Sequence, residues 1–471
     1  MITGVSVEGL FGTFDHNVEL NAQQGVTILA APNGYGKYTL LRMIKSVGEA
    51  AFGDLAQVPF ETFSVRDDQG PALVFSRRLV EGDRTAGDAG VERLLVFKGG
   101  RTGSFSDVEV VELAPGQSRV ELTVHCEGSE AELVPLGVFP LSGADPRIVK
   151  NPTQAEALLR HTASRLEFNQ WESSRGHSRW FEGPGSSFPE LPAWLQGRLA
   201  SMKVLLIESQ RLLVPEAEGH GRSRSDGPPA SIPAVTAISS DLVGRIRKAK
   251  IAYVTRSGDI DRTFPTRFLK LAQSGRHRTE SAPELRARLR ELDEKRAQLQ
   301  AVGILEREEL PALEIPDDIS EPYLQALSLL VGDIEDKLSH FDDLEGRIAL
   351  LRELANARFQ FKTLEIDAER GLHCASDGRD IPLVQLSSGE QHELVLFYEA
   401  LFQAEEGSLL MIDEPELSLH AAWQSEFIKD LKRILALSGG AVLIATHSSA
   451  LIGGAWDLVV ELTGPPSGLP S

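Results

Sequence analysis

The sequence has little cysteine, no long apolar run and no recognisable leader. Its two cysteines, Cys126 and Cys374, lie far apart and form no CxxC pair, which argues against a disulfide framework and a structural zinc site. No stretch approaches the roughly 20 apolar residues needed to cross a bilayer. The first residues, MITGVSVEGLFG, contain no basic segment followed by an apolar run, so we expect no signal peptide. These absences favour a cytoplasmic protein without a membrane partner.

The sequence is also short of positive charge overall. It has 48 Lys and Arg against 68 Asp and Glu, a formal net charge of −20, which argues against broad binding to nucleic acid or anionic membranes. The segment 243–278 is the exception, because its basic residues outnumber Asp259 and Asp261 by ten to two. The basic residues are Arg245, Arg247, Lys248, Lys250, Arg256, Arg262, Arg267, Lys270, Arg276 and Arg278. This basic segment is either a solvated helical surface or a face that contacts phosphates, including those of nucleic acid.

The pattern of apolar residues predicts an α/β protein with a helical insertion. Residues 26–30 form a short apolar run before a Gly-rich loop, and 39–47 have helical spacing. Strand-like stretches at 72–81, 92–98, 108–115 and 119–127 predict an antiparallel layer beside the core sheet.

From about 240 to 360 the pattern turns helical. A helix with a hydroxyl cap and an early proline is expected from Ser281, and a second begins after Ser320 and continues to Leu351. Their apolar stripes predict a short antiparallel helical hairpin.

The first chemical motif is the stretch AAPNGYGKYTLL, residues 30–41. Its loop includes Asn33 and two glycines. Gly34 and Gly36 let backbone N–H groups face a phosphate without a Cβ in the way. The helix that follows adds the positive end of its dipole, and Lys37 supplies a mobile charge for the β- and γ-phosphates. A glycine turn alone is weak evidence, but the strand–loop–helix context favours a phosphate site.

Two further motifs each follow a wholly apolar stretch. Asp413 and Glu414 come directly after LLMI, and His447 follows AVLIAT. At the carboxyl edge of an open α/β sheet, where ligands bind, one carboxylate can hold magnesium and the next can orient an attacking water. A solvated acidic turn is a poor alternative for Asp413 and Glu414, whereas a lone histidine such as His447 is more often structural.

The stretch LSSGEQHELVLFYEALF opens with Ser387, Ser388 and Gly389. A helix that starts with Ser and Gly presents backbone N–H groups that suit an anion. Simple capping of the helix remains an alternative explanation for these residues.

Taken together, the motifs resemble those of the ATP-binding-cassette ATPases, in particular the Rad50/SMC-like and OLD-like branch. Residues 31–37 are similar to the Walker A loop, LLMIDEP to Walker B, LSSGE to the signature motif and THSS to the switch histidine. Gln210 in LLIESQRLL occupies the place of the Q-loop, and residues 418–420 that of the D-loop. The motifs also occur in that family's order.

The resemblance implies a P-loop ATPase head, with a mixed sheet flanked by helices and an antiparallel β layer, interrupted by a helical or short coiled-coil insertion. We expect residues 1–215 to form the N-terminal lobe of the head, 216–360 the insertion and 361–471 the C-terminal lobe.

The resemblance further implies that ATP lies between two heads of a homodimer. Ser387, Ser388 and Gly389 would face the Walker A loop of the partner head, and the γ-phosphate would contact Ser387 and Gly389 in trans. Glu414 would be the general base and His447 the γ-phosphate sensor. Asp413 and Gln210 would hold Mg²⁺.

Tyr38 departs from the family pattern, because Walker A loops place Ser or Thr after the lysine to hold magnesium. A phenol oxygen projects a full ring further out than that hydroxyl and cannot replace it in place. Thr39 remains for the α-phosphate. The sequence therefore predicts binding of ATP with atypical Mg²⁺ coordination, and leaves open whether the protein hydrolyses ATP to ADP and phosphate.

About twenty residues follow His447, so we expect no room there for the Toprim domain that OLD-family nucleases carry. The layout instead resembles the stand-alone ATPases of anti-phage systems of the Septu and PARIS type, which act with a separately encoded, nuclease-like effector. Two alternatives stay open: a RecF-like or Rad50-like repair ATPase acting on DNA, and a non-hydrolysing scaffold in which nucleotide only joins the dimer.

Overall fold

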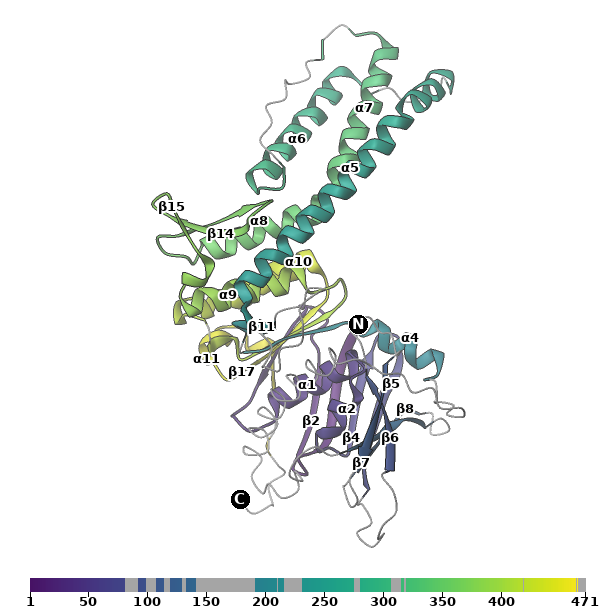
Figure 1. Cartoon of the computed structure of the whole chain (residues 1–471), viewed down its shortest axis with the longest axis vertical. Coiled ribbons are helices and arrows are strands. Elements are labelled where there is room, and N and C mark those ends of the chain that lie inside the picture. Colours follow the sequence, from purple (N-terminus) through teal and green to yellow (C-terminus); the bar gives the residue numbers. More distant parts are fainter. Residues whose placement is uncertain are drawn as a thin grey trace. The chain divides into compact units, whose positions relative to one another are not determined.

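The structure is a computed structural model in which the chain divides into two compact units (Figure 1). It describes residues 1–80, 92–98, 107–113, 119–128, 133–140, 191–209, 211–215, 231–274, 280–305, 315–316, 319–417, 419–462 and 464. The first unit contains 1–210 and 402–471, and the second contains 211–401. Both combine helices with sheets, which confirms the expected α/β class, whereas the functional division into three segments stays a prediction.

The first unit is built on a parallel sheet with the strand order β10-β16-β17-β3-β18. The strands are β3 (Val26–Ala30), β10 (Val204–Ile207), β16 (Leu409–Asp413), β17 (Ala441–Thr446) and β18 (Val459–Glu461). Every residue of β16 and β17 is buried. Strands covered on both faces are uniformly apolar, which explains why LLMI and AVLIA appear as unbroken apolar runs in the sequence.

A second, antiparallel sheet in the same unit has the strand order β2-β1-β4-β5-β8-β9. Its strands are β1 (Ile2–Leu10), β2 (Phe14–Glu19), β4 (Thr62–Asp67), β5 (Gly70–Val80), β8 (Arg119–Cys126) and β9 (Val134–Pro140), beside a hairpin of β6 (Glu92–Lys98) and β7 (Asp107–Leu113). The expected antiparallel layer is therefore confirmed. One hydrophobic core packs this layer against the helix that follows the Gly-rich loop.

The helices of the first unit follow its strands. They are α1 (Lys37–Gly48), α2 (Phe52–Gln57), α4 (Ala193–Ser201), α10 (Ala421–Ser438) and α11 (Ser449–Ile452), with 3-10 turns η3 (Pro415–Leu417) and η4 (Trp456–Leu458). Arg198 on α4 forms a two-pronged ion pair with the buried carboxylate of Asp67 at the end of β4, with N–O distances of 3.0 and 2.7 Å. This pair attaches α4 to the antiparallel sheet.

The second unit is mainly helical. Its helices are α5 (Ala234–Ser274), α6 (Ala282–Ala301), α7 (Glu321–Ser339), α8 (Asp342–Asn356) and α9 (Ser388–Phe402), with the 3-10 turn η2 (Leu383–Gln385). A three-stranded sheet of β13 (Thr363–Asp367), β14 (Gly371–Ser376) and β15 (Arg379–Ile381) and a pair of short strands, β11 (Leu213–Pro215) and β12 (Ser231–Pro233), complete it. α7 packs against both α5 and α6.

The expected start of α6 is confirmed, because Ser281 and Glu284 form a capping box ahead of Pro283. The expected helix from Ser320 to Leu351 is wrong in one respect, since it breaks after Ser339 and α8 begins at Asp342. Three acidic residues in the first turn of α8 favour a helix start there.

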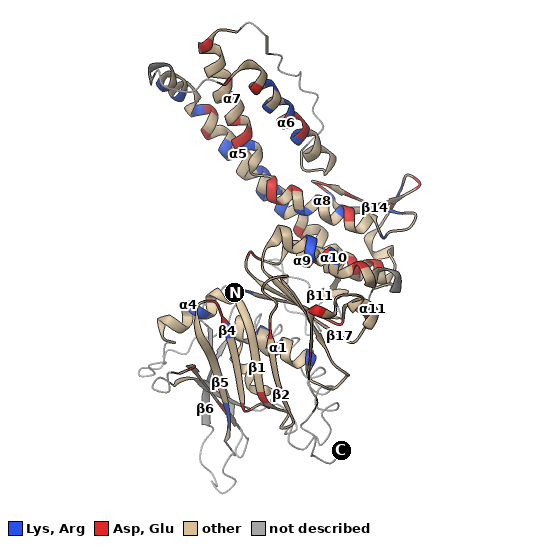
Figure 2. Ribbon diagram, turned by 180° about the vertical axis from the view of Figure 1, so that it is seen from behind, with Lys and Arg blue, Asp and Glu red and all other residues tan. Residues whose placement is uncertain are grey.

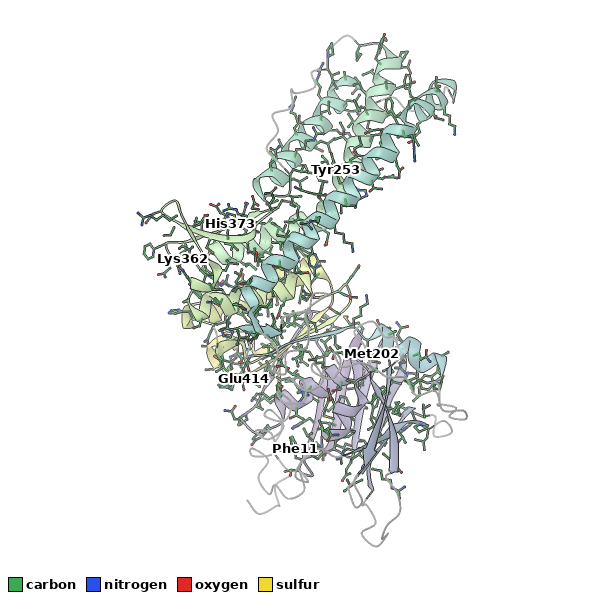
Figure 3. The ribbon with its side chains drawn as sticks, in the orientation of Figure 1. Phe11, Met202, Tyr253, Lys362, His373 and Glu414 are labelled. Carbon is green, nitrogen blue, oxygen red and sulfur yellow. The ribbon has the colours of Figure 1, made fainter. Side chains whose placement is uncertain are left out.

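Contacts at both ends of α5 fix it within the second unit. Near its start, Asp241 accepts a 2.6 Å hydrogen bond from the phenol of Tyr398 on α9. Farther along, Arg267 forms a two-pronged ion pair with Asp333 on α7, at 2.6 and 2.7 Å. Near the middle of the helix, the ring of Tyr253 lies 5.2 Å from that of Phe341, centroid to centroid. Figure 3 labels Tyr253 on the long helix.

Among the described residues, no helix is both long and apolar enough to span a membrane.

Candidate nucleotide site

The structure places three of the predicted motifs at one edge of the parallel sheet. In the register of the sheet, Ala30 at the end of β3 pairs with Thr446 at the end of β17. Ala445 of β17 in turn pairs with Asp413 at the end of β16. Because the strands are parallel, the Gly-rich loop, the acidic pair and the switch histidine all leave the sheet at its carboxyl edge. This edge is where open α/β sheets bind ligands.

The conformation of the Gly-rich loop depends on its glycines. Gly34 and Gly36 have φ values of 89° and 79°, in the left-handed region that disfavours residues with a Cβ. A Cβ on Gly36 would also lie 2.8 Å from Leu10 Cδ2. Gly36 is the N-cap of α1, whose first turn has neither a side-chain cap nor an acidic residue. The positive end of the helix therefore faces the loop without a competing side chain, as a phosphate site requires.

Two polar side chains of α1 are buried beside this loop. The ammonium of Lys37 donates to the carbonyls of Ala31 and Pro32, at 2.6 and 3.2 Å, so the lysine lies over the loop. The hydroxyl of Thr39 is buried and has no hydrogen-bond partner among the described residues. A buried unsatisfied hydroxyl is costly, and a phosphate oxygen would satisfy it. Asn33 is exposed in the loop.

The side chain of Tyr38 is directed into the protein. Tyr38 is only 6% exposed, and the guanidinium of Arg42, one turn later on α1, lies 5.9 Å from the centre of its ring. The residue after the Walker lysine is therefore part of the packed interior. Its ring fills space that a serine or threonine would leave empty.

His16 was not expected to belong to the site. It lies on β2, and its Nε2 donates to the carbonyl of Tyr35 in the Gly-rich loop at 2.9 Å, while Phe14 packs against the Tyr35 ring. Burial lowers the pKa of His16, although the hydrogen bond to Tyr35 opposes this change. A neutral imidazole on the antiparallel sheet thus supports the loop. No local sequence pattern indicates it.

The two acidic residues after LLMI differ in their surroundings. Asp413 is fully buried as the last residue of β16, and Glu414, labelled in Figure 3, is partly exposed. Glu414 has a φ of 43°, which is uncommon for a residue with a side chain. Its N–H donates to the carbonyl of Ala445 at 2.8 Å, so the neighbouring strand holds this backbone conformation. Such conformations concentrate at functional sites.

Glu416, two residues beyond Glu414, is a second unexpected member of the site. Its carboxylate oxygen Oε1 accepts a hydrogen bond from the backbone N–H of His447 at 3.0 Å. The same oxygen lies 3.2 Å from Nδ1 of the His447 ring. The turn after β16 is thereby joined to the residue that follows β17.

The signature residues belong to the second unit. Ser387 and Ser388 are exposed at the start of α9, and Gly389 is partly exposed. Ser387 donates from both its N–H and its hydroxyl to Glu390, at 2.8 and 2.9 Å, and Lys362 bonds the same carboxylate. Burial opposes ionisation of Glu390, but these hydrogen bonds outweigh it and lower its pKa. The hydroxyl of Ser387 therefore takes part in a helix cap.

A buried ion pair lies along the same helix. Glu393 on α9 and Arg358, just after α8, have side chains that are 1% and 6% exposed. The Arg358 guanidinium also lies 4.9 Å from the centre of the Phe397 ring. These contacts fix α9 to the end of α8 and thereby set the position of its first turn.

The basic segment has fewer unpaired positive charges to offer a phosphate than its sequence indicates. In Figure 2, acidic and basic residues are interspersed along α5 and α7. Four of its arginines form ion pairs with nearby carboxylates, and these are Arg245, Arg256, Arg262 and Arg267. Arg247 and Lys250, by contrast, form no ion pair in the described part of the chain. They line a groove of about 1180 Å³ together with Arg352 and with three acidic residues, Glu365, Asp367 and Glu369. Arg276 and Arg278 lie outside the described residues.

Two predicted residues cannot be placed. Gln210 and Ser418 lie outside the described residues. β10 pairs in parallel with β16 up to Ile207. Glu208 and Ser209, the two described residues that follow β10 in the chain, therefore leave the sheet at the same edge as Asp413. Within the described ranges, no group of three His, Cys, Asp or Glu side chains forms a metal site.

Parts of this chain are similar to known proteins. Residues 233–453 match the protein-family model described as "AAA domain, putative AbiEii toxin, Type IV TA system". The matched region contains the signature, Walker B and switch motifs, whereas the Gly-rich loop lies outside it. The strand–loop–helix arrangement around Lys37 lies outside the match and is an independent indication of a nucleotide site.

A stretch of 132 residues is 29% identical to "Protein ea59" of Escherichia phage lambda, covering 28% of this chain and 24% of that protein. The match thus spans about a quarter of this relative. Among solved structures, the chain is similar to the Smc head domain from Pyrococcus furiosus bound to the C-terminal domain of ScpA (10% identity, TM-score 0.32, covering 98% and 92% of the two chains). The SMC head domain from Thermotoga maritima is also similar (13% identity, TM-score 0.32, covering 98% and 94%).

Proposed function

We propose that this chain is an ATP-gated switch, in which ATP bound at the carboxyl edge of the parallel sheet controls a separately encoded effector. The observation that carries the proposal is the convergence at that edge of the Gly-rich loop with Lys37, of Asp413 and Glu414, and of His447. Lys37 and the first turn of α1 bind the β- and γ-phosphates, and the buried hydroxyl of Thr39 satisfies an oxygen of the α-phosphate.

In this proposal only a few protein side chains bind Mg²⁺. It dehydrates reluctantly and is commonly held by one or two carboxylates together with phosphate oxygens and water. Asp413 would supply the carboxylate and Gln210 an amide oxygen, and water would take the place of the Ser or Thr hydroxyl that Tyr38 does not provide at that position. With fewer ligands the metal is held less firmly, so hydrolysis with Glu414 as base is slow.

We further propose that the signature residues take part in an ATP-dependent homodimer. The exposed first turn of α9, with Ser388 and Gly389, offers backbone N–H groups to a γ-phosphate held by another copy of the chain. Because Ser387 is engaged with Glu390, the helix backbone contributes more than the Ser387 hydroxyl. Two such contacts related by a twofold axis make an ATP-dependent homodimer.

Binding of ATP is tested with a fluorescent nucleotide on purified protein, with Lys37→Ala as the variant and Lys429→Ala as the matched control on the exposed face of α10. We expect Lys37→Ala to weaken binding by about ten- to a hundredfold and the control to keep it, because a charge-assisted contact to phosphate is worth about 1.5–3 kcal/mol. Equal affinity of the two variants would remove the nucleotide site from this edge.

Dimerisation is tested by sedimentation of Glu414→Gln with and without ATP. The amide keeps the shape of the side chain but cannot accept a proton, so ATP persists and the dimer accumulates. Adding Ser388→Arg should restore the monomer, since a bulky side chain at the start of α9 blocks the partner's phosphate. A dimer that forms equally without ATP would contradict the nucleotide-dependent interface.

The role in anti-phage defence rests on the resemblance to Septu- and PARIS-type ATPases. It is supported by the matched family, whose description names a toxin of a Type IV TA system. Co-expression with the neighbouring genes, followed by purification through this chain with ATP and with ADP, would identify an effector. Capture that is the same with both nucleotides would argue against gating.

A second candidate function, binding of a nucleic-acid backbone as in repair ATPases, would depend on Arg247 and Lys250, which line the groove together with the acidic Glu365, Asp367 and Glu369. The double variant Arg247→Glu with Lys250→Glu should weaken binding to single- or double-stranded DNA and RNA and should reduce its salt dependence by about two units of slope. Arg262→Glu, on the same helix but paired with Asp259, is the control. If the double variant and Arg262→Glu changed nucleic-acid binding equally, the basic segment would be only a solvated surface.

A further inference from the structure

We infer that Glu416 is a positioning residue that fixes both the orientation and the tautomer of His447. This inference rests on the function proposed above and on the role of γ-phosphate sensor that the family resemblance implies for His447. It adds a residue outside the acidic pair that the Walker B resemblance assigns, and it specifies which ring nitrogen of His447 faces the nucleotide.

The carboxylate of Glu416 makes two contacts with one residue. Oε1 accepts the backbone N–H of His447 at 3.0 Å, which fixes the start of the turn after β17. The same oxygen lies 3.2 Å from Nδ1, so the carboxylate faces the Nδ1 edge of the ring. The Glu416 side chain is 7% exposed and that of His447 is 42% exposed, so the holding group is inside and the held ring reaches outward.

The identity of the partners determines the tautomer. An ionised carboxylate can only accept hydrogen bonds, so the Nδ1 that faces it carries the hydrogen. In the neutral ring Nε2 then has a bare lone pair. His447 can therefore accept a hydrogen bond from an attacking water through Nε2. It can donate to a phosphate oxygen from Nε2 only after it takes up a proton.

The second oxygen of Glu416 strengthens the inference. Oε2 is buried and has no hydrogen-bond partner among the described residues. A buried carboxylate with one unsatisfied oxygen costs stability, so packing alone does not explain it. A role in holding His447 does explain why a carboxylate lies there.

Glu416 also connects His447 to the proposed general base. Glu416 lies in the 3-10 turn η3, which Glu414 directly precedes, and the N–H of Leu417 in that turn donates to the carbonyl of Glu414 at 3.2 Å. The residue that contacts His447 and the proposed base are thus joined within one turn of the chain.

The deciding measurement is the ¹⁵N NMR spectrum of the imidazole rings in protein labelled at histidine, recorded over a pH series. The signal of His447 is assigned by its loss in His447→Gln. In the wild-type chain the neutral ring should show a protonated Nδ1 and an unprotonated Nε2. In Glu416→Ala the hydrogen should move wholly or partly to Nε2, whereas Glu426→Ala, an exposed acid on α10, should leave the ring unchanged.

Function is read separately by adding ATP. In the wild type, ATP should shift the Nε2 resonance of His447, and Glu416→Ala should reduce this shift. The substitution should also lower any turnover by at least about tenfold. This is the lower end of the loss that is typical when the group orienting a metal-bound histidine is removed. A tautomer that is the same in the wild type and in Glu416→Ala would overturn the inference. If the tautomer changes as expected but ATP shifts no His447 signal in the wild type, Glu416 still positions the ring and the proposed role in sensing γ-phosphate fails.

Discussion

Replacing Tyr38 by serine should speed up the ATP hydrolysis proposed above. Serine would place a hydroxyl one carbon from the backbone at the start of α1, where a magnesium ligand is expected in Walker A loops. A metal held by one more oxygen stabilises the charge that develops on the phosphates during transfer. We expect turnover to rise at least about tenfold, which corresponds to about 1.4 kcal/mol of transition-state stabilisation.

The same substitution should destabilise the protein, because Tyr38 is 6% exposed. Removing a buried aromatic ring typically costs about 3–5 kcal/mol. For a domain of this size each kcal/mol lowers Tm by about 2–4 °C, so Tm should fall by roughly 10 °C. ATP with magnesium should recover part of this loss, since a ligand that binds only the folded protein stabilises it.

The assay is steady-state release of phosphate at a temperature at least 15 °C below the measured Tm of the variant, over a magnesium titration. Tyr38→Phe is the matched control because it keeps the ring and removes only the phenol oxygen. The control should turn over ATP as slowly as the wild type.

Two results would refute the reasoning. If folded Tyr38→Ser shows wild-type turnover at every magnesium concentration, the missing hydroxyl does not limit the reaction. If Tyr38→Phe is as fast as Tyr38→Ser, the limit comes from the phenol oxygen itself.

Three further predictions follow from contacts in the two units. Glu414→Gln should lower turnover by at least a hundredfold while ATP stays bound, as measured in a single turnover; unchanged turnover would exclude Glu414 as the base. Glu393→Ala should cost about 3–5 kcal/mol in urea unfolding because it leaves Arg358 buried without its carboxylate, and a loss below 1 kcal/mol would show that water reaches the pair. Because burial lowers the pKa of His16, the unfolded chain binds the proton more readily. Unfolding free energy should therefore fall as pH drops below about 6.5, and His16→Gln should flatten this decline.

The sequence predicts which motifs meet at the carboxyl edge of the parallel sheet because the relevant signals are local. LLMI and AVLIA are strands buried on both faces, and the residues that directly follow them must lie where the strands end. The Gly-rich loop is equally local, since its glycines, lysine and helix are contiguous. Such patterns need no knowledge of which strands become neighbours.

Residues that join separate segments leave no such signal. Glu416 contacts a residue 31 positions away, and His16 contacts one 19 positions away across two strands. The basic segment illustrates the same limit, because the carboxylates that pair with Arg256 and Arg267 are 80 and 66 positions distant. Charge can be counted in a sequence, but its neutralisation depends on packing.

The helix α5 has a mechanical consequence within its own unit. Asp241, which α9 contacts through Tyr398, and Arg267, which contacts α7, are 26 residues apart on one helix, or about 40 Å at 1.5 Å per residue. A helix of this length acts as a lever, so a tilt of about 5° at the α9 end would carry the far contact through about 3 Å. That distance is comparable to the length of a hydrogen bond. A rotation of α9 of this size would therefore strain the ion pair between Arg267 and Asp333 on α7, unless the contact of Tyr253 with Phe341 absorbs it.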